Sequence, residues 1–344
     1  MNAKERFLNQ FQGKEVDMTP VGSTTTYAVV AFGEACGHER PFADTDAQAM
    51  FEWAMVPPKL VGWEWVKAMG WDIIPLSEAL GVELGMPTRD TQYYVKGHPY
   101  AESLEGLEFP DDFLERGRFP VYRKQFELLK EAVGDEMIYF GESEGAFTAA
   151  ANLVGTEQFM RWCFKDQAKV EQVLEVTAEA AVAAANFAFD MGAAYYVFAE
   201  PTSGPALLSP RLYKKIVLPL EQKIIERVKG PVVLHICANT DPIISMMCDT
   251  GAKGISIEEK ADMKAAVEIA EAQGVRVFGN VATATTLFNG TPQECYDEAI
   301  AALKNGTHFL CPGCGVAPPS PIENLKQLRK ARDDFFGVKS EWTD

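Results

Sequence analysis

Short apolar runs alternate with longer amphipathic stretches along most of the chain. The apolar runs are rich in Val, Ile, Phe and Tyr, which favour strands, whereas the stretches between them carry apolar residues at helical spacing. The predicted strands are 19–23, 71–76, 137–143, 193–200, 231–237, 254–259, 275–280 and 307–313. Helical patterns cover residues 156–191, 210–229 and 291–304. Strands that alternate with helices in this way indicate a parallel sheet.

The number of strands predicts the architecture. Eight strand–helix units close a parallel sheet into a barrel, so the expected fold class is α/β, a (β/α)8 TIM barrel. Residues 24–70 and 80–136 are longer than single crossovers require, and we interpret them as N-terminal helical insertions over the barrel mouth. In the more regular second half, glycine-containing turns precede the predicted strands, where helix C-caps are expected. No linker or low-complexity tract divides the chain, so we predict a single domain over residues 1–344.

Composition narrows the functional class. The 344 residues include 49 acidic and 32 basic side chains, for a formal net charge of −17, which disfavours binding to nucleic acid. The first 17 residues lack the apolar core of a signal peptide, and no run of apolar residues is long enough to span a membrane. We therefore expect a cytoplasmic protein. Its seven cysteines have no regular spacing, which favours thiols and metal ligands over disulfides.

Four residues able to bind a metal fall at the predicted C-terminal ends of strands, where barrels of this class place their active sites. His235 and Cys237 close the fifth strand, and their two-residue spacing puts both side chains on the same face. Glu258 closes the sixth strand, and Cys314 lies after the eighth in the loop CPGCGVAPPSP. One nitrogen, two sulfurs and one oxygen form a borderline-soft donor set that suits zinc.

Each of these residues also has a structural interpretation. A single histidine at a strand end is often a hydrogen-bonded core residue, and a buried cysteine often packs as a small hydrophobe. Cys311 and Cys314 form a C-x-x-C, which is also found in redox pairs and zinc knuckles. There is no second C-x-x-C and no helix start here, so we expect Cys311 to pack within its strand. A His-x-Cys pair combined with a distant cysteine favours the metal interpretation.

The donor set also indicates a reaction type. Two thiolates reduce the effective positive charge of zinc, whereas hydrolytic sites usually use histidine and carboxylate ligands to polarise water. An electron-rich zinc is better suited to holding a substrate thiol as a nucleophilic thiolate. Alkyl transfer to sulfur is the chemistry that this set favours.

Several segments resemble a known family over nearly the whole chain. They are ERFLNQFQGKEVDMTPVGS, GESEGAFTAAANLVGTEQFMRW, EPTSGPALLSPRLYKKIVLP, HICANTDPI, GNVATATTLFNGTPQE and PGCGVAPPSPIENLKQL. The sequence is similar to the methylcobamide:coenzyme M methyltransferases, the zinc branch of the uroporphyrinogen decarboxylase superfamily. The His-x-Cys followed by a distal cysteine is the specific part of the resemblance, since decarboxylase members lack it. Ala238 departs from the family pattern, where glycine is common.

The resemblance implies a ligand set and a reaction. It implies that His235, Cys237 and Cys314 bind zinc and that Glu258 holds the fourth position until the substrate thiolate displaces it. These four residues are the expected catalytic and metal-binding residues. The implied reaction moves a methyl group from a methyl-Co(III) corrinoid, carried by a separate corrinoid protein, to a thiol such as coenzyme M. The chain lacks an Asp-x-His-x-x-Gly cobalamin motif, which agrees with a separate carrier.

Further expectations concern cofactor contacts and partners. Glu142, Glu200 and Asn239 lie at or just after strand ends and are candidates for contacting the cofactor. The expected partners are a corrinoid protein and a small thiol substrate, without nucleic acid or membrane, in a monomer or homodimer.

Three other functions stay open. The same scaffold would serve a methyltransferase that demethylates a substrate and loads the corrinoid protein. A uroporphyrinogen decarboxylase-like activity is disfavoured, because residues 19–37 lack the arginines that would hold a substrate with several carboxylates. A binding module with a structural zinc would need four tightly held ligands.

Overall fold

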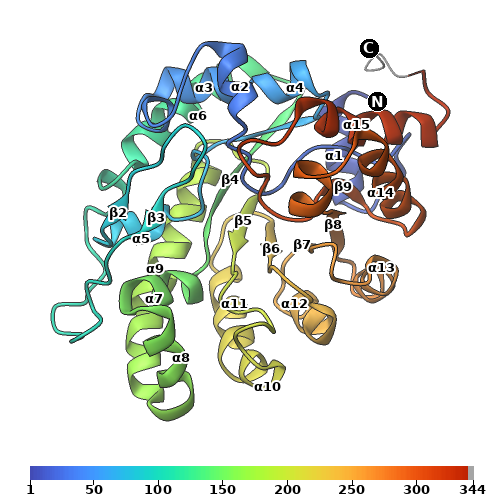
Figure 1. Ribbon diagram of the computed structural model, residues 1–344. Helices are drawn as coiled ribbons and strands as arrows, with labels where there is room; N and C mark the ends of the chain where they lie inside the picture. The colour runs from blue at the N-terminus through green and yellow to red at the C-terminus, as the bar shows by residue number, and fades with distance from the viewer. Residues whose placement is uncertain (340–344) are drawn as a thin grey trace.

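The computed structural model describes residues 1–339 and shows a barrel of parallel strands surrounded by helices (Figure 1). Neighbouring strands pair in the order β1-β4-β5-β6-β7-β8-β9, and all of these pairs are parallel. Their bounds are β1 Trp65–Lys67, β4 Ile138–Glu144, β5 Tyr196–Ala199, β6 Val232–His235, β7 Gly254–Ser256, β8 Arg276–Val281 and β9 Phe309–Pro312. The segment around Val21 fills the eighth position. It forms a parallel bridge to Leu310 and accepts a hydrogen bond from the Glu64 amide, so it joins β9 to the chain entering β1.

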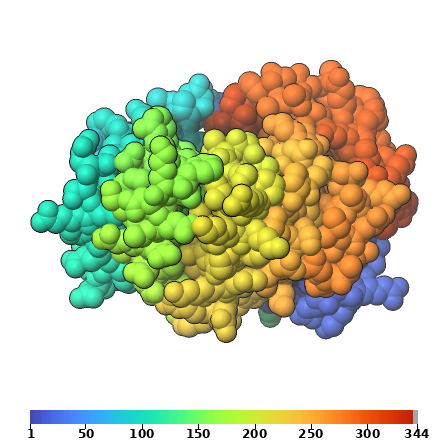
Figure 2. All heavy atoms as spheres, turned by 90° about the horizontal axis from the view of Figure 1, so that it is seen from below, coloured from blue at the N-terminus to red at the C-terminus, as the bar shows by residue number. Residues whose placement is uncertain are grey.

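The main helices follow the strands in chain order. In the second half they are α7 Ala146–Val154, α8 Thr156–Lys165, α9 Gln167–Asp190, α10 Pro210–Leu212, α11 Leu218–Ile225, α12 Ile244–Cys248, α13 Met263–Ala272, α14 Pro292–Lys304 and α15 Ile322–Phe335. The π-helical turns η3 Tyr213–Val217 and η5 Thr283–Phe288 and the 3-10 turn η4 Asp241–Ile243 complete this part. Figure 2 shows the segments succeeding one another across the outer surface in the same order, from green through yellow to orange.

The first part of the chain is less regular. It contains α1 Ala3–Phe11, α2 Val30–Cys36, α3 Ala47–Ala54, α4 Val56–Leu60, α5 Pro75–Ala79 and α6 Phe119–Val133, the 3-10 turns η1 Phe42–Asp44 and η2 Phe113–Glu115, and an antiparallel pair, β2 Leu84–Gly85 and β3 Tyr94–Val95. Residues 26–30 lie along the loop that follows β9, since Val30 donates to the Pro318 carbonyl and Val316 to the Thr26 carbonyl. The first insertion therefore reaches the C-terminal end of the barrel, as predicted.

The barrel interior is filled by apolar side chains. Its inner cluster comprises Phe7, Trp65, Ile138, Phe140, Tyr195, Val197, Val233, Phe278, Phe309 and Cys311. Phe7 comes from α1 and stacks on Tyr195 with 5.2 Å between ring centroids. The Lys4 amide bonds the Glu136 carbonyl just before β4, and Gln10 bonds the His308 carbonyl just before β9. Helix α1 thus closes the N-terminal end of the barrel, so an active site is expected at the other end. Cys311 packs in the core, as predicted.

The predicted strands from residue 137 onward are confirmed, but the one at 71–76 is wrong. The second strand of the barrel is β1, which lies inside the segment predicted to be the first insertion. At 71–76 the Asp72 carboxylate accepts from the Ile74 amide, and Pro75 then begins helix α5. The presence of Lys67 in a strand that is buried throughout concealed β1 in the sequence. The predicted strand at 19–23 is reduced to the single bridge at Val21.

The long helical patterns are also interrupted. The stretch 156–191 forms two helices, because α8 ends at Lys165 and the Asp166 side chain caps the start of α9. The stretch 210–229 contains α10, η3 and α11. Helix α14 begins as predicted, with Thr291 and Glu294 forming a capping box.

Two further findings bear on the compositional expectations. All seven cysteines are free thiols. Among residues 1–339, no helix combines the length and the apolar character needed to cross a bilayer.

Candidate metal centre

Polar side chains occupy the level of the barrel just above its apolar interior. Residues two positions beyond the inner cluster point to the same side of their strands. They are Lys67, Glu142, His235 and Asn280. Ser256 lies beside His235 on the neighbouring strand, since the two residues pair in register. A polar layer therefore forms the floor of the barrel mouth, at the C-terminal ends of the strands.

Three metal-capable side chains meet in this layer. His235 ends β6, Cys237 follows two residues later, and Cys314 lies in the loop after β9. The Nε2 atom of His235 is 3.2 Å from Sγ of Cys237 and 3.6 Å from Sγ of Cys314, and the two sulfurs are 3.5 Å apart. The structure thus brings together three of the four predicted ligands, although the cysteines are 77 residues apart in the sequence.

The triangle of donor atoms fits a tetrahedral cation. Ligands held at about 2.0–2.3 Å from zinc place neighbouring donor atoms about 3.3–3.8 Å apart. The three measured separations, 3.2, 3.5 and 3.6 Å, match that spacing closely. One imidazole and two sulfurs are also ligands that zinc prefers. The residues present therefore fit a zinc ion with three protein ligands and one further coordination position.

The ring of His235 is oriented by a neighbour on β7. Its Nδ1 atom is 3.0 Å from Oγ of Ser256, which leaves Nε2 directed at the two cysteines. His235 is only 3 % exposed, so water cannot easily replace this hydrogen bond. A partner on the second ring nitrogen is typical of histidine metal ligands.

Backbone geometry and the first insertion position the two cysteine loops. Ala238 adopts a left-handed conformation with φ of 69°, which turns the chain sharply after Cys237. The hydroxyl of Thr25 donates to the Cys314 carbonyl at 2.8 Å. A Cβ atom at Gly315 would lie 2.7 Å from Oγ1 of Thr26, so a larger residue there would force the Thr26 side chain to shift.

The two sulfurs and the imidazole shift one another's pKa. The pKa of the Cys237 thiol is raised, because it shares a hydrogen bond with Cys314 and because it is buried. The pKa of Cys314 is lowered well below its usual value by that same bond and by the His235 ring. Burial opposes charge on His235, but Cys314 outweighs it and raises the imidazole pKa. The cluster thus favours a thiolate at Cys314, with the His235 ring as its hydrogen-bond donor. A bound cation would displace the protons that remain on these three side chains.

Glu258, the fourth predicted ligand, borders the cluster rather than completing it. It lies just beyond β7, is 8 % exposed, and its Oε2 atom is 3.6 Å from Nζ of Lys260. Its charge contributes to the raised pKa of the Cys237 thiol, which places it on the Cys237 side. Coordination by Glu258 stays a prediction.

Glu142, on β4, is buried inside the barrel near the cluster. Its Oε2 atom is 3.2 Å from Nζ of Lys67 on β1, and both side chains are fully buried. Burial raises the pKa of Glu142 to about 7, although Lys67 opposes this shift. The charges of His235 and Cys314 also act on this carboxyl group, so it belongs to the electrostatic surroundings of the donor atoms. A cofactor contact of Glu142 stays a prediction.

Glu200 and Asn239 are both engaged locally. The Glu200 carboxylate accepts hydrogen bonds from the Phe147 and Thr148 amides and from the Thr148 hydroxyl, and thereby caps the start of α7. Asn239 is exposed, and its Oδ1 atom accepts from the Asp241 amide. These bonds account for both residues structurally, and contacts with a cofactor stay predictions.

Sequence reasoning missed Lys67, Ser256 and Thr25. The signal for Ser256 was present, since it lies two residues before Glu258 in a predicted strand and shares its face. Lys67 carried a weaker signal as the one basic residue in the apolar run WEWVKAMGW. Nothing local in the sequence indicates that Thr25 contacts a loop 289 residues away.

Comparisons with known proteins give a consistent result. The family model described as uroporphyrinogen decarboxylase (URO-D) matches residues 2–335. The methylcobamide:CoM methyltransferase MtaA of Methanosarcina barkeri (strain Fusaro / DSM 804) is 35% identical over 333 residues, which cover 97% of this chain and 98% of that protein. The methylcobamide:CoM methyltransferase MtbA of Methanosarcina acetivorans is 29% identical over 340 residues, covering 96% of this chain and 98% of the other.

A solved structure agrees with this likeness. A methyltransferase from Methanosarcina mazei superposes with a TM-score of 0.94 at 37% identity, covering 98% of this chain and 99% of that one. By contrast, the match to the uroporphyrinogen decarboxylase of Nostoc punctiforme covers only 64% of this chain and 65% of that protein, at 27% identity.

Proposed function

The chain belongs to the uroporphyrinogen decarboxylase family and is a methyltransferase, and from this premise we propose that it methylates coenzyme M or a similar small thiol. The proposed donor is a methyl-Co(III) corrinoid carried by a separate corrinoid protein. The relatives that match over nearly their full length carry names that specify a methylcobamide and CoM. The main support for the proposal is that one imidazole and two sulfurs lie close together at the barrel mouth.

We propose that His235, Cys237 and Cys314 hold zinc, with Glu258 close enough to take the fourth position before substrate binds. A zinc ion in this sulfur-rich site would lower the pKa of a bound substrate thiol and keep it nucleophilic as the thiolate. Ser256 holds the His235 ring in the orientation that directs Nε2 at the two cysteines. Lys67, Glu142 and His235 are buried beside the site, and the low dielectric of such surroundings strengthens electrostatic interactions with the donor atoms.

In the proposed transfer, the methyl group moves from cobalt to the substrate sulfur. The substrate thiol loses its proton, and its sulfur then attacks the methyl carbon. The S–C bond forms while the Co–C bond breaks, and cobalt keeps the electron pair and leaves as Co(I). We propose that Glu258, which acts on the Cys237 thiol, receives the proton of the substrate thiol.

The direct test mixes purified protein, methylcobalamin and coenzyme M, and follows Co(I) in the visible spectrum. We expect Co(I) to form only with the zinc-loaded protein, and methylated coenzyme M to appear in equal amount. Removal of zinc by a chelator is expected to abolish the transfer, while circular dichroism shows the barrel intact, as for a catalytic site. Full activity of metal-free protein would contradict the proposal. Unfolding on zinc removal would favour a structural zinc.

One alternative keeps the same site but reverses the flow of methyl groups. A protein that loads the corrinoid would form methylcobalamin from Co(I) and a methylated substrate, and would give no Co(I) with any thiol. The names of the relatives favour transfer to coenzyme M. We also propose a cytoplasmic location, because a reducing compartment keeps all seven thiols free.

A further inference from the structure

The Glu258 carboxylate lies near both the donor cluster and an exposed lysine. The pKa of the Cys237 thiol is raised by its hydrogen bond with Cys314 and by burial, and the charge of Glu258 adds to this shift. The Oε2 atom of Glu258 is buried, and within residues 1–339 it has no hydrogen-bond partner. The Nζ atom of Lys260, in the turn after β7, is 3.6 Å away, just beyond hydrogen-bond distance. A buried carboxylate oxygen beside the donor cluster therefore has a cation within short reach.

Lys260 is free to move toward this oxygen. Its side chain is 61% exposed, and within the described part of the chain Glu258 is the only acidic residue that pairs with its ammonium group. Lysine carries its charge on a flexible four-carbon stem. Rotation of that stem is sufficient to bring Nζ into hydrogen-bond contact with Oε2.

The backbone that connects the two residues is held in place. The carbonyl oxygen of Glu258 accepts hydrogen bonds from the Ala261 amide at 3.1 Å and from Nδ2 of Asn280 at 3.2 Å. A Cβ atom at Gly313 would lie 3.1 Å from Cα of Glu258, so the loop that leads to Cys314 packs directly against this backbone. The Glu258 carboxylate can therefore change its partner by rotation of its own side chain, without movement of the turn.

We propose that Lys260 pairs with the Glu258 carboxylate when a substrate thiolate takes its place at the metal centre. This rests on the function proposed above, in which Glu258 takes the fourth coordination position before substrate binds. The proton that Glu258 receives from the thiol passes to solvent, and the displaced carboxylate is left with a negative charge. A largely buried charge is costly without a partner, and Lys260 supplies one. Lys260 is thus a positioning residue, which favours substrate binding by holding Glu258 away from the metal.

Removal of the lysine charge tests this role through binding rather than turnover. Calorimetric titration of the zinc-loaded Lys260→Met variant with coenzyme M should give a Kd about three- to fivefold above that of the wild type, the size expected for a partly exposed ion pair. Zinc affinity of the substrate-free protein should stay within about twofold, because Glu258 does not yet need Lys260 in that state. Lys260→Arg keeps the charge and should restore the wild-type Kd.

A double-variant comparison assigns the effect to Glu258. In the Glu258→Gln background, Lys260→Met should leave the Kd for coenzyme M unchanged, because a neutral amide needs no counter-charge. The titration is repeated with 2-mercaptoethanol, which lacks the sulfonate group of coenzyme M. The loss of affinity in Lys260→Met should be the same for this neutral thiol, because it arises from the displaced carboxylate and not from the substrate's own charge.

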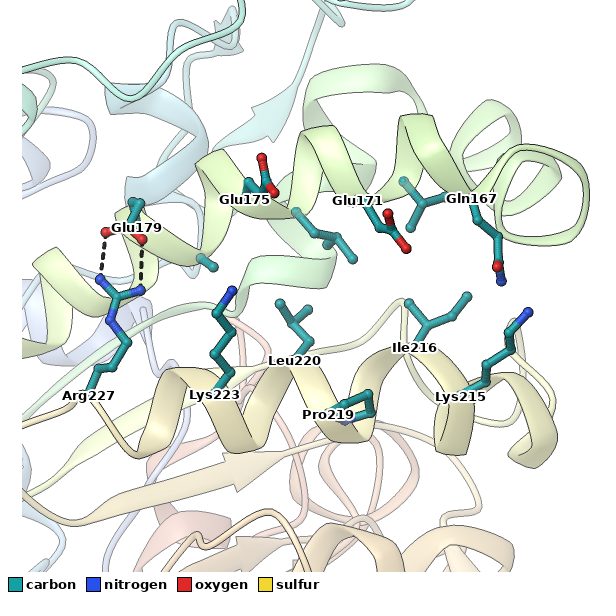
Figure 3. A pocket seen from close by; sticks show the side chains of 13 residues that line it. Gln167, Glu171, Glu175, Glu179, Lys215, Ile216, Pro219, Leu220, Lys223 and Arg227 are labelled. Carbon is teal, nitrogen blue, oxygen red and sulfur yellow. Dashed lines mark hydrogen bonds and ion pairs between the residues drawn. The ribbon is translucent and has the colours of Figure 1, made fainter.

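Lys223→Met is the matched control for the change in net charge. Lys223 lies on α11, in the groove of about 730 Å³ between α9 and α11 on the outside of the barrel (Figure 3). Like Lys260 it is exposed, and within residues 1–339 it forms no ion pair. We expect this variant to bind zinc and coenzyme M as the wild type does.

Three results would overturn the role of Lys260. One is an unchanged Kd for coenzyme M in Lys260→Met, and another is a loss of affinity that persists in the Glu258→Gln background. The third is a loss seen with coenzyme M but not with 2-mercaptoethanol, since Lys260 would then bind the sulfonate. Failure of the zinc-loaded wild-type protein to bind any thiol would instead contradict the proposed function, so the two failures are distinguishable.

Discussion

Residues 137–312 and residues 19–136 build the same barrel in different ways. In the second region each strand leads through helices to the next, and six strands follow one another from β4 to β9. In the first region one strand has three residues and the other is reduced to a bridge, while most of the chain lies in helices and loops outside the sheet. The regular region supplies His235 and Cys237, and the third candidate ligand, Cys314, lies two residues beyond its end.

The irregular region contributes the surroundings of that site. Thr25 bonds the Cys314 carbonyl, and Lys67 pairs with Glu142 inside the barrel. Glu144, at the end of β4, accepts hydrogen bonds from the Leu76 and Ser77 amides and so ties α5 to the regular region. The comparison indicates that the regular region determines the donor atoms, whereas the irregular region determines their environment.

Loss of a donor in the regular region should have the largest effect. We expect Cys237→Ala or Cys314→Ala to lose zinc and to lower methyl transfer by more than the roughly 10–100-fold typical of changing a residue that hydrogen-bonds a metal ligand. Zinc content by mass spectrometry and the methylcobalamin assay measure both effects. Cys311→Ala is the matched control, because Cys311 belongs to the same C-x-x-C but packs in the core. Full zinc content in either ligand variant would contradict the assignment.

Breaking the buried Lys67–Glu142 pair between the two regions should have the second-largest effect. Lys67→Met leaves the Glu142 carboxyl in the barrel without its counter-charge, and removal of one partner of a buried pair costs about 3–5 kcal/mol in the free energy of unfolding. Denaturant unfolding of the zinc-loaded protein measures this loss. The double variant Lys67→Met/Glu142→Gln should recover much of it, because no unpaired charge remains. Equal stability of Lys67→Met and wild type would show that the pair does not join the regions.

The orientation of His235 provides a smaller and more local test. Ser256→Ala removes the hydrogen bond to Nδ1, and we expect zinc affinity to fall about 10–100-fold without loss of the fold. A zinc competition titration with a coloured chelator measures the affinity. Ser203→Ala is the control, because that buried hydroxyl donates to the Glu200 carbonyl instead. An unchanged zinc affinity in Ser256→Ala would mean that the ring is held by its packing alone.

The smallest expected effect is a pH dependence at the contact between the regions. Burial raises the pKa of Glu144 to about 8, although its bonds from Ser77 and Leu76 oppose this. Because the folded-state pKa is raised above the value of about 4.5 for an unperturbed glutamate, the stabilisation is complete below pH 4.5 and is lost as pH rises through about 8. Calorimetry should show Tm falling over this range in the wild type and a shallower fall in Glu144→Gln.

Glu200→Gln sharpens this pH comparison. Glu200 is also buried, with a pKa raised to about 7, but it caps α7 within the regular region. Its removal should flatten the pH profile at lower pH than removal of Glu144. Parallel profiles for wild type and both variants would contradict these assignments.

The regular region was predictable because its signals are local. Its apolar runs end at polar residues, and its turns contain Gly192, Gly251, Gly274 and Gly306, all with positive φ. The His-x-Cys spacing was visible for the same reason, since the period of a strand places both residues on one face. These patterns were sufficient to expect the three donor atoms at the barrel mouth.

The remaining features depend on tertiary contacts that no local pattern reports. Strand β1 contains Lys67, which is tolerated only because Glu142 lies opposite it in the folded barrel. The run at 71–76 has the composition of a strand, but Asp72 and Pro75 turn it into a helix start. Glu200 lies at a strand end near the mouth, yet the start of α7 takes up its carboxylate.

X-ray absorption at the zinc edge tests the central proposal most directly, by counting the sulfur neighbours of the metal without and with coenzyme M. We expect two sulfurs, from Cys237 and Cys314, in the substrate-free protein. Saturating coenzyme M should raise the count to three as its thiolate binds. A count that stays at two while methyl transfer proceeds would contradict activation of the thiol at this site.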